Sequence, residues 1–116
     1  MTDEEYYEFI RPYEDAKQML LTRLDVLNHN LYGEASARPI HNIQCRIKKK
    51  RSIEEKLRRK GKEETVINAK DYLQDIAGVR VICYFVDDIY NLTELLKSQS
   101  DLIVIKERDY ISSPKP

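Results

Sequence analysis

An aspartate and an arginine flank the short run DIAGVR, which leads from a polar segment into an apolar one. Asp75 stands first in this run, and Arg80 stands inside the apolar stretch from Val79 to Phe85. A carboxylate at the mouth of a strand is a typical metal ligand, and the small residues Ala77 and Gly78 would let a substrate approach the main chain. Asp75 has a second interpretation, as a turn residue that caps the bend into the strand.

Arg80 needs a partner if the apolar stretch around it is buried. A guanidinium group in an apolar environment is costly unless it is paired. A phosphate or a stacked nucleobase would serve, because the group is planar and permanently charged. Asp75 is the alternative partner within the chain.

The most basic part of the chain is segment 46–62, which has ten Lys and Arg against two Glu and therefore a local net charge of +8. The whole chain has a net charge of zero. Arg46, Lys48 and Lys56 are candidates for binding an anion, although their spacing does not place them on one face of a single helix. The other cations are expected to form a solvated face; they include Lys49, Lys50, Arg58, Arg59, Lys60 and Lys62.

A helix that begins at Ser52 would let two segments of this basic region converge on one ligand. Ser52 and Glu55 have the spacing of a capping box, and Gly61 follows basic residues that suit the last turn of a helix. The free N–H groups at such a helix start would add to an anion site.

The hydrophobic pattern predicts the elements that would position these residues. Leucine and isoleucine recur at helical spacing over about residues 4–32, with Gly33 as a plausible end of this long amphipathic helix. Ile40, Ile43 and Ile47 fall on one helical face and predict a second helix.

The second half of the chain alternates between predicted helices and strands. A short helix is expected to close at Gly78, followed by a central strand over residues 79–85. The next helix is capped by Asp87 or Asp88, and residues 101–111 predict a second strand. The order strand, helix, strand indicates a βαβ-like or mixed sheet, and hence an α/β or α+β domain.

Length and composition narrow the class of protein. The chain of 116 residues is one domain or part of one, and with 41% hydrophobic and 34% charged residues it is globular rather than disordered. Cys45 and Cys83 are expected to be free thiols, and His29 and His41 make no metal-ligand spacing with them. With no signal peptide and no apolar run that could cross a bilayer, a cytoplasmic protein without membrane contacts is expected.

Three motifs in order resemble one known family. RIKKKRSIEEKLRRKG, DIAGVRVICYFVDDIY and VIKERDYISSPKP together resemble the RelA/SpoT-type alarmone synthetase domain, most closely that of a stand-alone small alarmone synthetase. The resemblance implies a nucleotidyltransferase fold like that of polymerase β, a mixed sheet flanked by helices. It also implies a GTP pyrophosphokinase, which transfers pyrophosphate from ATP to the 3′-hydroxyl of GTP or GDP and makes (p)ppGpp in the stringent response.

The resemblance also implies roles for particular residues in binding ATP. Arg46 and Arg80 would sandwich the adenine, since guanidinium planes suit stacking. Lys48 and Lys56 would hold the phosphates, with Ser52 nearby.

The remaining implied roles concern the metal ion and the acceptor nucleotide. Asp75 would bind Mg²⁺ and lie close to the attacking 3′-hydroxyl. Arg108 and Lys115 would contact the phosphates of GTP or GDP. The family continues with an Asn-Gly-Tyr turn that stacks on guanine and with a strand whose Glu completes the metal site, and neither is present before Pro116.

We therefore expect an N-terminal part of one synthetase domain, with a helix and loop in residues 1–38 and the ATP-site half in residues 39–116, and no activity from this chain by itself. Two alternatives stay open: a degenerate module that binds nucleotide or RNA without catalysis, and an interaction domain for an acidic partner. The resemblance further implies a homotetramer, with RNA or alarmone as possible regulators. The leucines of the first helix could contribute to assembly or could pack on their own sheet.

Overall fold

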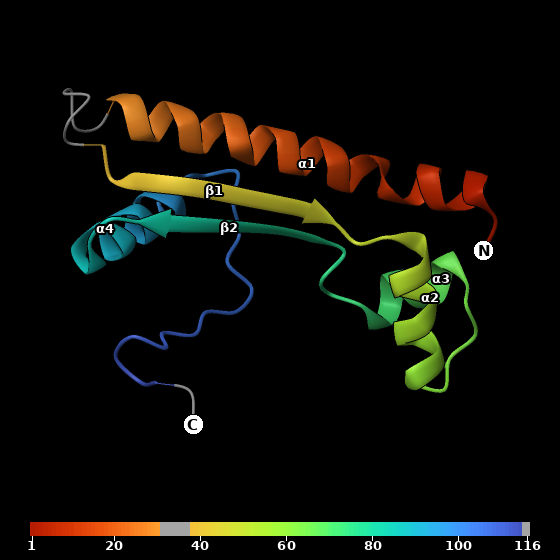
Figure 1. Ribbon diagram of the computed structural model, residues 1–116. Helices are drawn as coiled ribbons and strands as arrows, with labels where there is room; N and C mark the ends of the chain where they lie inside the picture. The colour runs from red at the N-terminus through yellow and green to blue at the C-terminus, as the bar shows by residue number, and fades with distance from the viewer. Residues whose placement is uncertain (31–37, 115–116) are drawn as a thin grey trace.

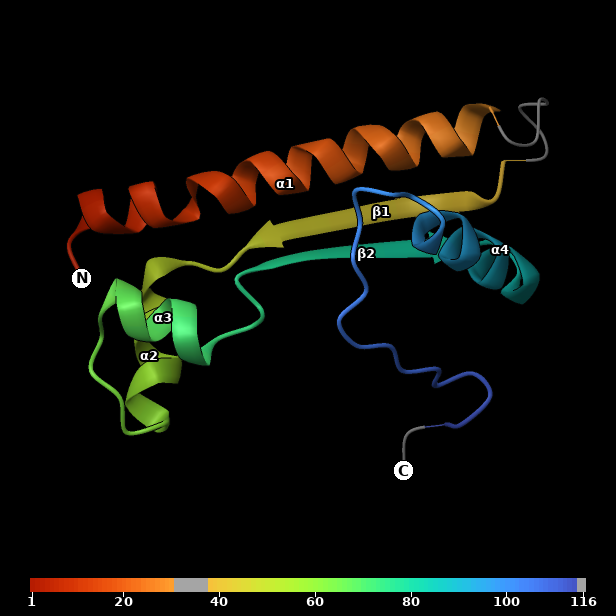
Figure 2. The same ribbon diagram turned by 180° about the vertical axis from the view of Figure 1, so that it is seen from behind.

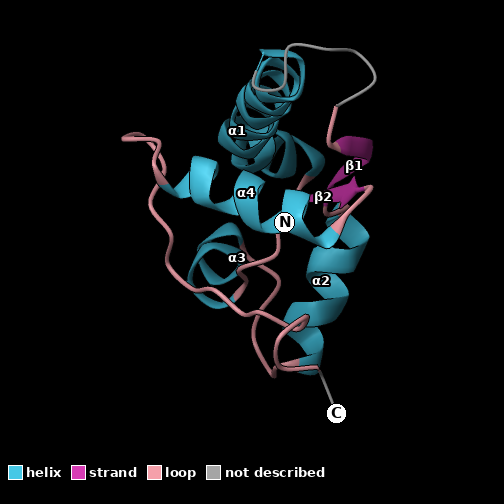
Figure 3. Cartoon of the chain, turned by 90° about the vertical axis from the view of Figure 1, so that its left-hand side faces the viewer, coloured by secondary structure: helices cyan, strands magenta, loops and turns pink. Residues whose placement is uncertain are grey.

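The computed structural model describes residues 1–30 and 38–114 and contains helices arranged around a small sheet (Figures 1 and 3). The elements in chain order are α1 (Asp3–Asn30), β1 (Ile40–Ile47), α2 (Lys50–Arg59), α3 (Val66–Tyr72), β2 (Ala77–Cys83) and α4 (Val86–Lys97). The α+β class expected from the sequence is confirmed. The expectations for Gly33 and Lys115 lie outside the described residues. No helix in the described ranges combines the length and apolar character needed to cross a membrane.

The long first helix expected from the sequence is present as α1, which lies along the two strands (Figures 1 and 2). Its start carries a reciprocal capping pair: the Thr2 N–H donates to Glu5 Oε1 at 2.8 Å, and the Glu5 N–H donates to Thr2 Oγ1 at 3.1 Å. Leu24 is fully buried, with Leu20 and Leu27 packed around it against the strands. These leucines therefore pack on the chain's own sheet.

The sheet consists, in the described part of the chain, of two antiparallel strands rather than a mixed set. Ile43 pairs with Val81, and both contribute to the core cluster under α1 and α4. Because successive side chains of a strand point to opposite faces, the other face carries a different set of residues. That set includes Gln44, Arg46, Gly78 and Arg80.

The predicted helix at residues 40–47 is wrong, because this segment is strand β1. A register irregularity between Ile40 and Asn42 inserts an extra residue into the period-two pattern of the strand. Ile40 and Ile43 therefore face the same core despite a spacing of three, and Ile47 follows Ile43 at an even spacing. Because of this bulge, the spacing of Ile40, Ile43 and Ile47 fits a helix as well as it fits a strand.

The predicted strand at residues 101–111 is also wrong, since no described residue there is in a strand. The segment runs on from α4 as an extended chain (Figure 2), and Ile103 and Ile105 are 88% and 95% exposed. A strand forms only where a neighbour pairs its main-chain groups. The apolar sequence is present, but no neighbouring strand pairs with it in the described residues.

Three element boundaries also differ from expectation. Strand β2 begins at Ala77, so Gly78 lies inside it instead of closing a helix. The preceding helix is α3, whose start is capped by Thr65, the side chain of which accepts from the Asn68 N–H at 3.2 Å. Helix α4 begins after Phe85, with the two aspartates in its first turn rather than at the cap.

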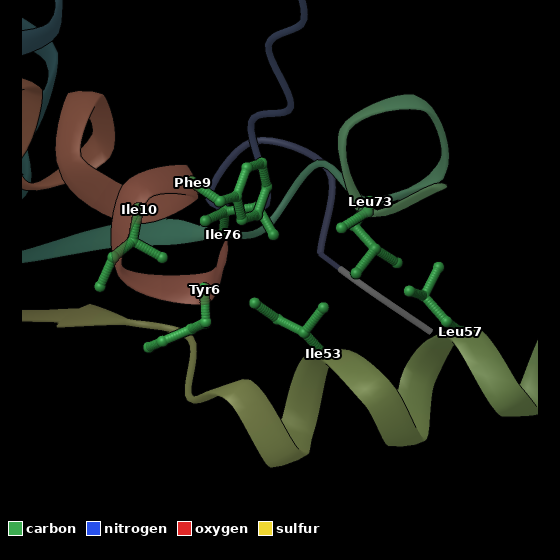
Figure 4. Close-up of a cluster of buried hydrophobic side chains, with 8 residues drawn as sticks. Tyr6, Phe9, Ile10, Ile53, Leu57, Leu73 and Ile76 are labelled. Atoms are coloured by element: carbon green, nitrogen blue, oxygen red, sulfur yellow. The ribbon is translucent and has the colours of Figure 1, made fainter. Parts of the chain in front are cut away.

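A compact apolar cluster joins the start of α1 to α2 and α3 (Figure 4). Ile53 and Leu57 of α2 are completely buried in it, together with Ile76 from the segment just before β2. The other members are Tyr6, Phe9, Ile10, Ala69 and Leu73. The cluster fixes α2 and α3 at the end of the sheet where β1 finishes and β2 starts (Figure 1).

Candidate functional site

Antiparallel pairing brings two of the expected site residues together. Ile47 at the end of β1 pairs with Ala77 at the start of β2, so the residues just outside both strands are neighbours. The Lys48 N–H donates to the Ile76 carbonyl at 2.7 Å. This hydrogen bond continues the pairing of the two chain segments beyond the ends of the strands. Lys48 Nζ consequently lies 3.2 Å from Asp75 Oδ2.

Helix α2 supplies the third charged group. Lys56 Nζ lies 2.9 Å from Asp75 Oδ1, so the two lysines bind different oxygens of one carboxylate. The rotation of the helix is fixed by Ile53 and Leu57, which are buried in the apolar cluster. The convergence of Lys48 and Lys56 from two segments was predicted and is observed.

Ser52 lies on the same side of α2 as Lys56, four residues earlier, but it is not the N-cap. The observed N-cap is Lys49, three residues before the predicted cap Ser52, and it makes no side-chain cap bond. The chain leaves the strand at Lys48 and turns at once into α2, which leaves no room for a separate cap at Ser52. The predicted capping box is therefore wrong, while the N–H groups of the first turn stay available for an anion.

Two cations facing one carboxylate give this three-residue cluster a net charge of +1. Partial burial alone would raise the pKa of Asp75, but the hydrogen bonds from Lys56 and Lys48 and their positive charges outweigh it and lower this pKa to about 2. Asp75 is therefore ionised throughout the physiological range. Its side chain remains 39% exposed, so a ligand can reach it.

The lowered pKa predicts a specific acid sensitivity. Since the folded-state pKa of about 2 lies below the ordinary 3.8, this contribution to stability is complete above pH 3.8 and disappears as the pH falls towards 2. Allowing for solvent screening of a partly exposed group, we expect a loss of about 1 kcal/mol.

Urea unfolding of the wild type and Asp75→Asn at several pH values between 6 and 2 would measure this contribution. The difference between the two proteins should shrink over the window between pH 4 and pH 2. A difference that stays constant down to pH 2 would show that Asp75 is not held by the two lysines.

The two arginines lie on the open face of the sheet, beside this cluster. They line a pocket of about 390 Å³ together with Gln44, Cys45, Gly78 and Val79. Arg46 pairs with Gly78, and its side chain passes 3.9 Å from the point where a Cβ of that glycine would lie. Arg80 is exposed. The expectation that it sits in a buried run is wrong, because α1 and α4 cover only the opposite face.

In the described part of the chain, Arg108 does not belong to the cluster of Lys48, Lys56 and Asp75. It belongs to the extended segment after α4, and its Nη1 donates to Tyr110 Oη at 3.2 Å. Lys115, its expected companion, lies outside the described residues.

Among the other cations of segment 46–62, the expected exposure is confirmed for Lys49, Arg58, Arg59, Lys60 and Lys62. Lys50 differs, because it is half-buried and pairs with Asp3 and Glu54. Arg58 Nε donates to Glu64 Oε1 at 2.8 Å, and Lys62 Nζ lies 4.4 Å above the ring of Tyr72. Both cysteines are free, as expected.

The cluster of Lys48, Lys56 and Asp75 offers one carboxylate as a ligand for a magnesium ion. Within the described ranges no group of three or more His, Cys, Asp or Glu side chains could hold a metal. Asp75 nevertheless has the right donor chemistry, since it is ionised, accessible and an oxygen ligand. Mg²⁺ commonly binds one or two carboxylates and completes its shell with water and substrate phosphates, so Asp75 fits as one ligand of an ion that arrives with a nucleotide.

A larger hollow than the arginine pocket lies elsewhere on the described surface. A pocket of about 660 Å³ between α1 and α3 is lined by apolar side chains such as Phe9 and Tyr13, with Glu5 and Glu8 at its side. Lys70 is the one cation among its lining residues. This pocket does not suit a polyanion.

Two further residues of the site were not identified from the sequence. Gln44 lines the arginine pocket, and recognising β1 as a strand would have placed it opposite Arg80. Tyr6 Oη donates to the Lys48 carbonyl at 2.9 Å across 42 residues of chain. No local pattern indicates such a contact.

Several known proteins are similar to this chain in sequence and in structure. Residues 45–116, more than half of the chain, match a family described as "Region found in RelA / SpoT proteins". GTP pyrophosphokinase YwaC of Bacillus subtilis is 40% identical over 104 residues, which cover 90% of this chain and 50% of that protein. GTP pyrophosphokinase YjbM of the same organism is 36% identical over 115 residues, which cover 99% of this chain and 53% of that protein.

A solved structure is also similar to this chain in fold and in sequence. The small alarmone synthetase 1 from Bacillus subtilis bound to its product pppGpp superposes with a TM-score of 0.81 and 35% identity, over 97% of this chain and 57% of that one. The chain thus spans about half the length of the curated relatives that it matches.

Proposed function

The chain belongs to the RelA/SpoT family, and we propose that it forms the ATP-binding part of a GTP pyrophosphokinase that makes (p)ppGpp. In this reaction the 3′-oxygen of GTP or GDP bonds to the β-phosphorus of ATP. The bond between that phosphorus and the oxygen bridging to the α-phosphate breaks, and AMP leaves. The observation that carries the proposal is the convergence of Lys48, Lys56 and Asp75 beside the pocket of Arg46 and Arg80.

The two lysines are suited to hold the phosphates of ATP. In the nucleotide-free protein they bind the Asp75 carboxylate, which keeps their ammonium groups in place and partly desolvated. A triphosphate carries more negative charge than one carboxylate and can displace it from one or both lysines. Phosphoryl transfer depends mainly on positioning and charge neutralisation, and the lysines supply both.

The two arginines are suited to hold a nucleobase. Arg46 pairs with Gly78 and Arg80 pairs with Gln44, so the arginines are diagonal neighbours on one face. Such neighbours are separated by roughly 7–8 Å, about twice the 3.5 Å contact distance of stacked carbon atoms. This spacing suits a planar base stacked between two guanidinium groups, and Gly78 adds no side chain of its own beneath that of Arg46.

Asp75 is proposed to have two tasks. It would hold Mg²⁺, which neutralises charge that develops on the phosphates during transfer. It would also accept a hydrogen bond from the attacking 3′-hydroxyl and orient its oxygen. Asp75 is ionised at neutral pH with or without the two lysines, because even its ordinary pKa of 3.8 lies well below that pH.

The other roles and properties expected from the sequence are also proposals. Arg108 and Lys115 are proposed to contact the phosphates of the acceptor nucleotide. A homo-oligomer in the cytoplasm, with alarmone or RNA as regulators, is also proposed. Because Leu24 and its neighbours pack on the sheet, the leucines of α1 are not the proposed assembly surface.

The experiment that tests the proposed activity follows both products in one reaction. The protein at its full natural length is incubated with ATP, GTP and Mg²⁺, and AMP and pppGpp are separated by chromatography. Equal amounts of AMP and pppGpp support the proposal. Binding of ATP with neither product formed would favour the non-catalytic binding module instead.

A further inference from the structure

Lys48 is held by its main chain as well as by its side chain. Its N–H donates to the Ile76 carbonyl at 2.7 Å, and its carbonyl accepts from Tyr6 Oη at 2.9 Å. Among the described residues this hydroxyl is the single hydrogen-bond donor to the Lys48 carbonyl. The two bonds hold the peptide groups on either side of the Lys48 Cα, at the junction between β1 and α2.

Tyr6 is itself immobilised by its surroundings. Its side chain is buried in the apolar cluster, where Phe9, Ile10 and Ile53 also lie, and Figure 4 shows it beside the chain that leads into α2. The ring therefore cannot follow Lys48 if that residue moves. Tyr6 lies in the first turn of α1, which contributes no other group to the site.

We propose that Tyr6 is a positioning residue, whose hydroxyl fixes the Lys48 main chain so that its ammonium group points at the phosphates of the bound nucleotide. This inference rests on the proposed function for the role of Lys48. The hydroxyl acts through geometry and touches no substrate. α1 is thereby an integral part of the phosphate site, although its sequence carries no phosphate-binding motif.

The arrangement has a clear physical consequence. Without the Tyr6 hydroxyl the Lys48 carbonyl must turn towards water, and the peptide group between Lys48 and Lys49 can rotate, because only the preceding peptide group stays bonded to the Ile76 carbonyl. The long Lys48 side chain magnifies a small rotation at its Cα into a larger displacement at Nζ. The bond from Lys48 to Asp75, and any bond that replaces it on a nucleotide, would weaken.

The first test needs no nucleotide. Tyr6→Phe and Tyr7→Phe each remove one hydroxyl from adjacent tyrosines, but Tyr7 is largely exposed and serves as the matched control. Amide hydrogen exchange is measured on both variants at full natural length. Protection of the Lys48 amide should fall at least about fivefold in Tyr6→Phe and stay unchanged in Tyr7→Phe. Equal protection in the two variants would overturn the proposal.

The second test is a double-mutant cycle on binding of a non-hydrolysable ATP analogue. A net hydrogen-bond contribution predicts that Tyr6→Phe weakens binding by about three- to tenfold, and Lys48→Met should weaken it by about tenfold or more. In the Lys48→Met background, Tyr6→Phe should change affinity by less than about 1.5-fold.

The outcomes separate this inference from the proposed function. Equal effects of Tyr6→Phe with and without Lys48 would indicate general destabilisation and overturn the positioning role. Should the wild type bind no nucleotide, the proposed function fails, while the amide-exchange result still decides whether Tyr6 holds Lys48.

Discussion

Asp75→Asn is expected to lower (p)ppGpp synthesis by about 1,000-fold or more, while binding of the metal-free ATP analogue becomes about three- to tenfold tighter. The loss follows because an amide is a poor Mg²⁺ ligand and a weaker acceptor for the attacking hydroxyl, and single electrostatic contacts in a transition state are worth about 10²–10³ in rate. The gain follows because Lys48 and Lys56 no longer bind a carboxylate and both are free for phosphate.

Asp71→Asn is the control, since Asp71 is an exposed acid on α3 close in sequence to Asp75. Synthesis rate is measured with Mg²⁺, and affinity by calorimetry without it, for both variants. Slower synthesis together with tighter metal-free binding is expected only for a carboxylate that competes with phosphate for the two lysines. An Asp75→Asn variant that keeps more than a tenth of the wild-type rate would exclude the proposed role of this residue.

Ile53→Ala is expected to destabilise the fold by about 2–5 kcal/mol, the range for removing a fully buried aliphatic side chain. Ile53 has no exposed surface and contacts the start of α1 and the segment before β2. The cavity would loosen α2, on which Lys56 depends for its position. We therefore expect a lower urea midpoint and also weaker nucleotide binding under conditions in which the variant is folded.

Ile67→Ala supplies the comparison for the same chemical change. Ile67 is exposed on α3, and alanine favours helix, so the unfolding free energy should change by less than about 0.5 kcal/mol. Equal effects of the two substitutions would contradict the packing of α2 on α1. A large loss of stability in Ile53→Ala alone would confirm it.

The sequence predicted α1, β2 and α4 well because each has a clear period or a long apolar run. It failed at β1, where the bulge next to Ile40 gives isoleucine a spacing that also fits a helix. It failed at residues 101–111 for another reason: Ile103 and Ile105 have strand propensity, but pairing depends on a neighbour that local sequence does not specify.

For the site residues, too, the success of the prediction depended on whether the signal lay in neighbouring residues or in residues far apart in the sequence. Residue types and family resemblance indicated that Lys48 and Lys56 could converge on one anionic ligand. They did not predict that both would bind Asp75, which was considered as a partner of Arg80 instead. Ser52 was misjudged because a capping box is a local pattern, whereas the start of α2 is set by the end of β1. Tyr6 could not be found from the sequence, since its contact joins residues 42 positions apart.

The most direct test of the account is calorimetric titration of a non-hydrolysable ATP analogue with Mg²⁺ into the wild type, Arg80→Ala and Arg59→Ala. Arg80 lines the proposed base pocket, and Arg59 is an exposed arginine on α2. We expect Arg80→Ala to weaken binding at least about tenfold, because stacking on one guanidinium plane is lost, and Arg59→Ala to bind like the wild type. Equal weakening in both variants, or no binding by a folded wild type, would contradict the claim that these strands and α2 form the ATP site.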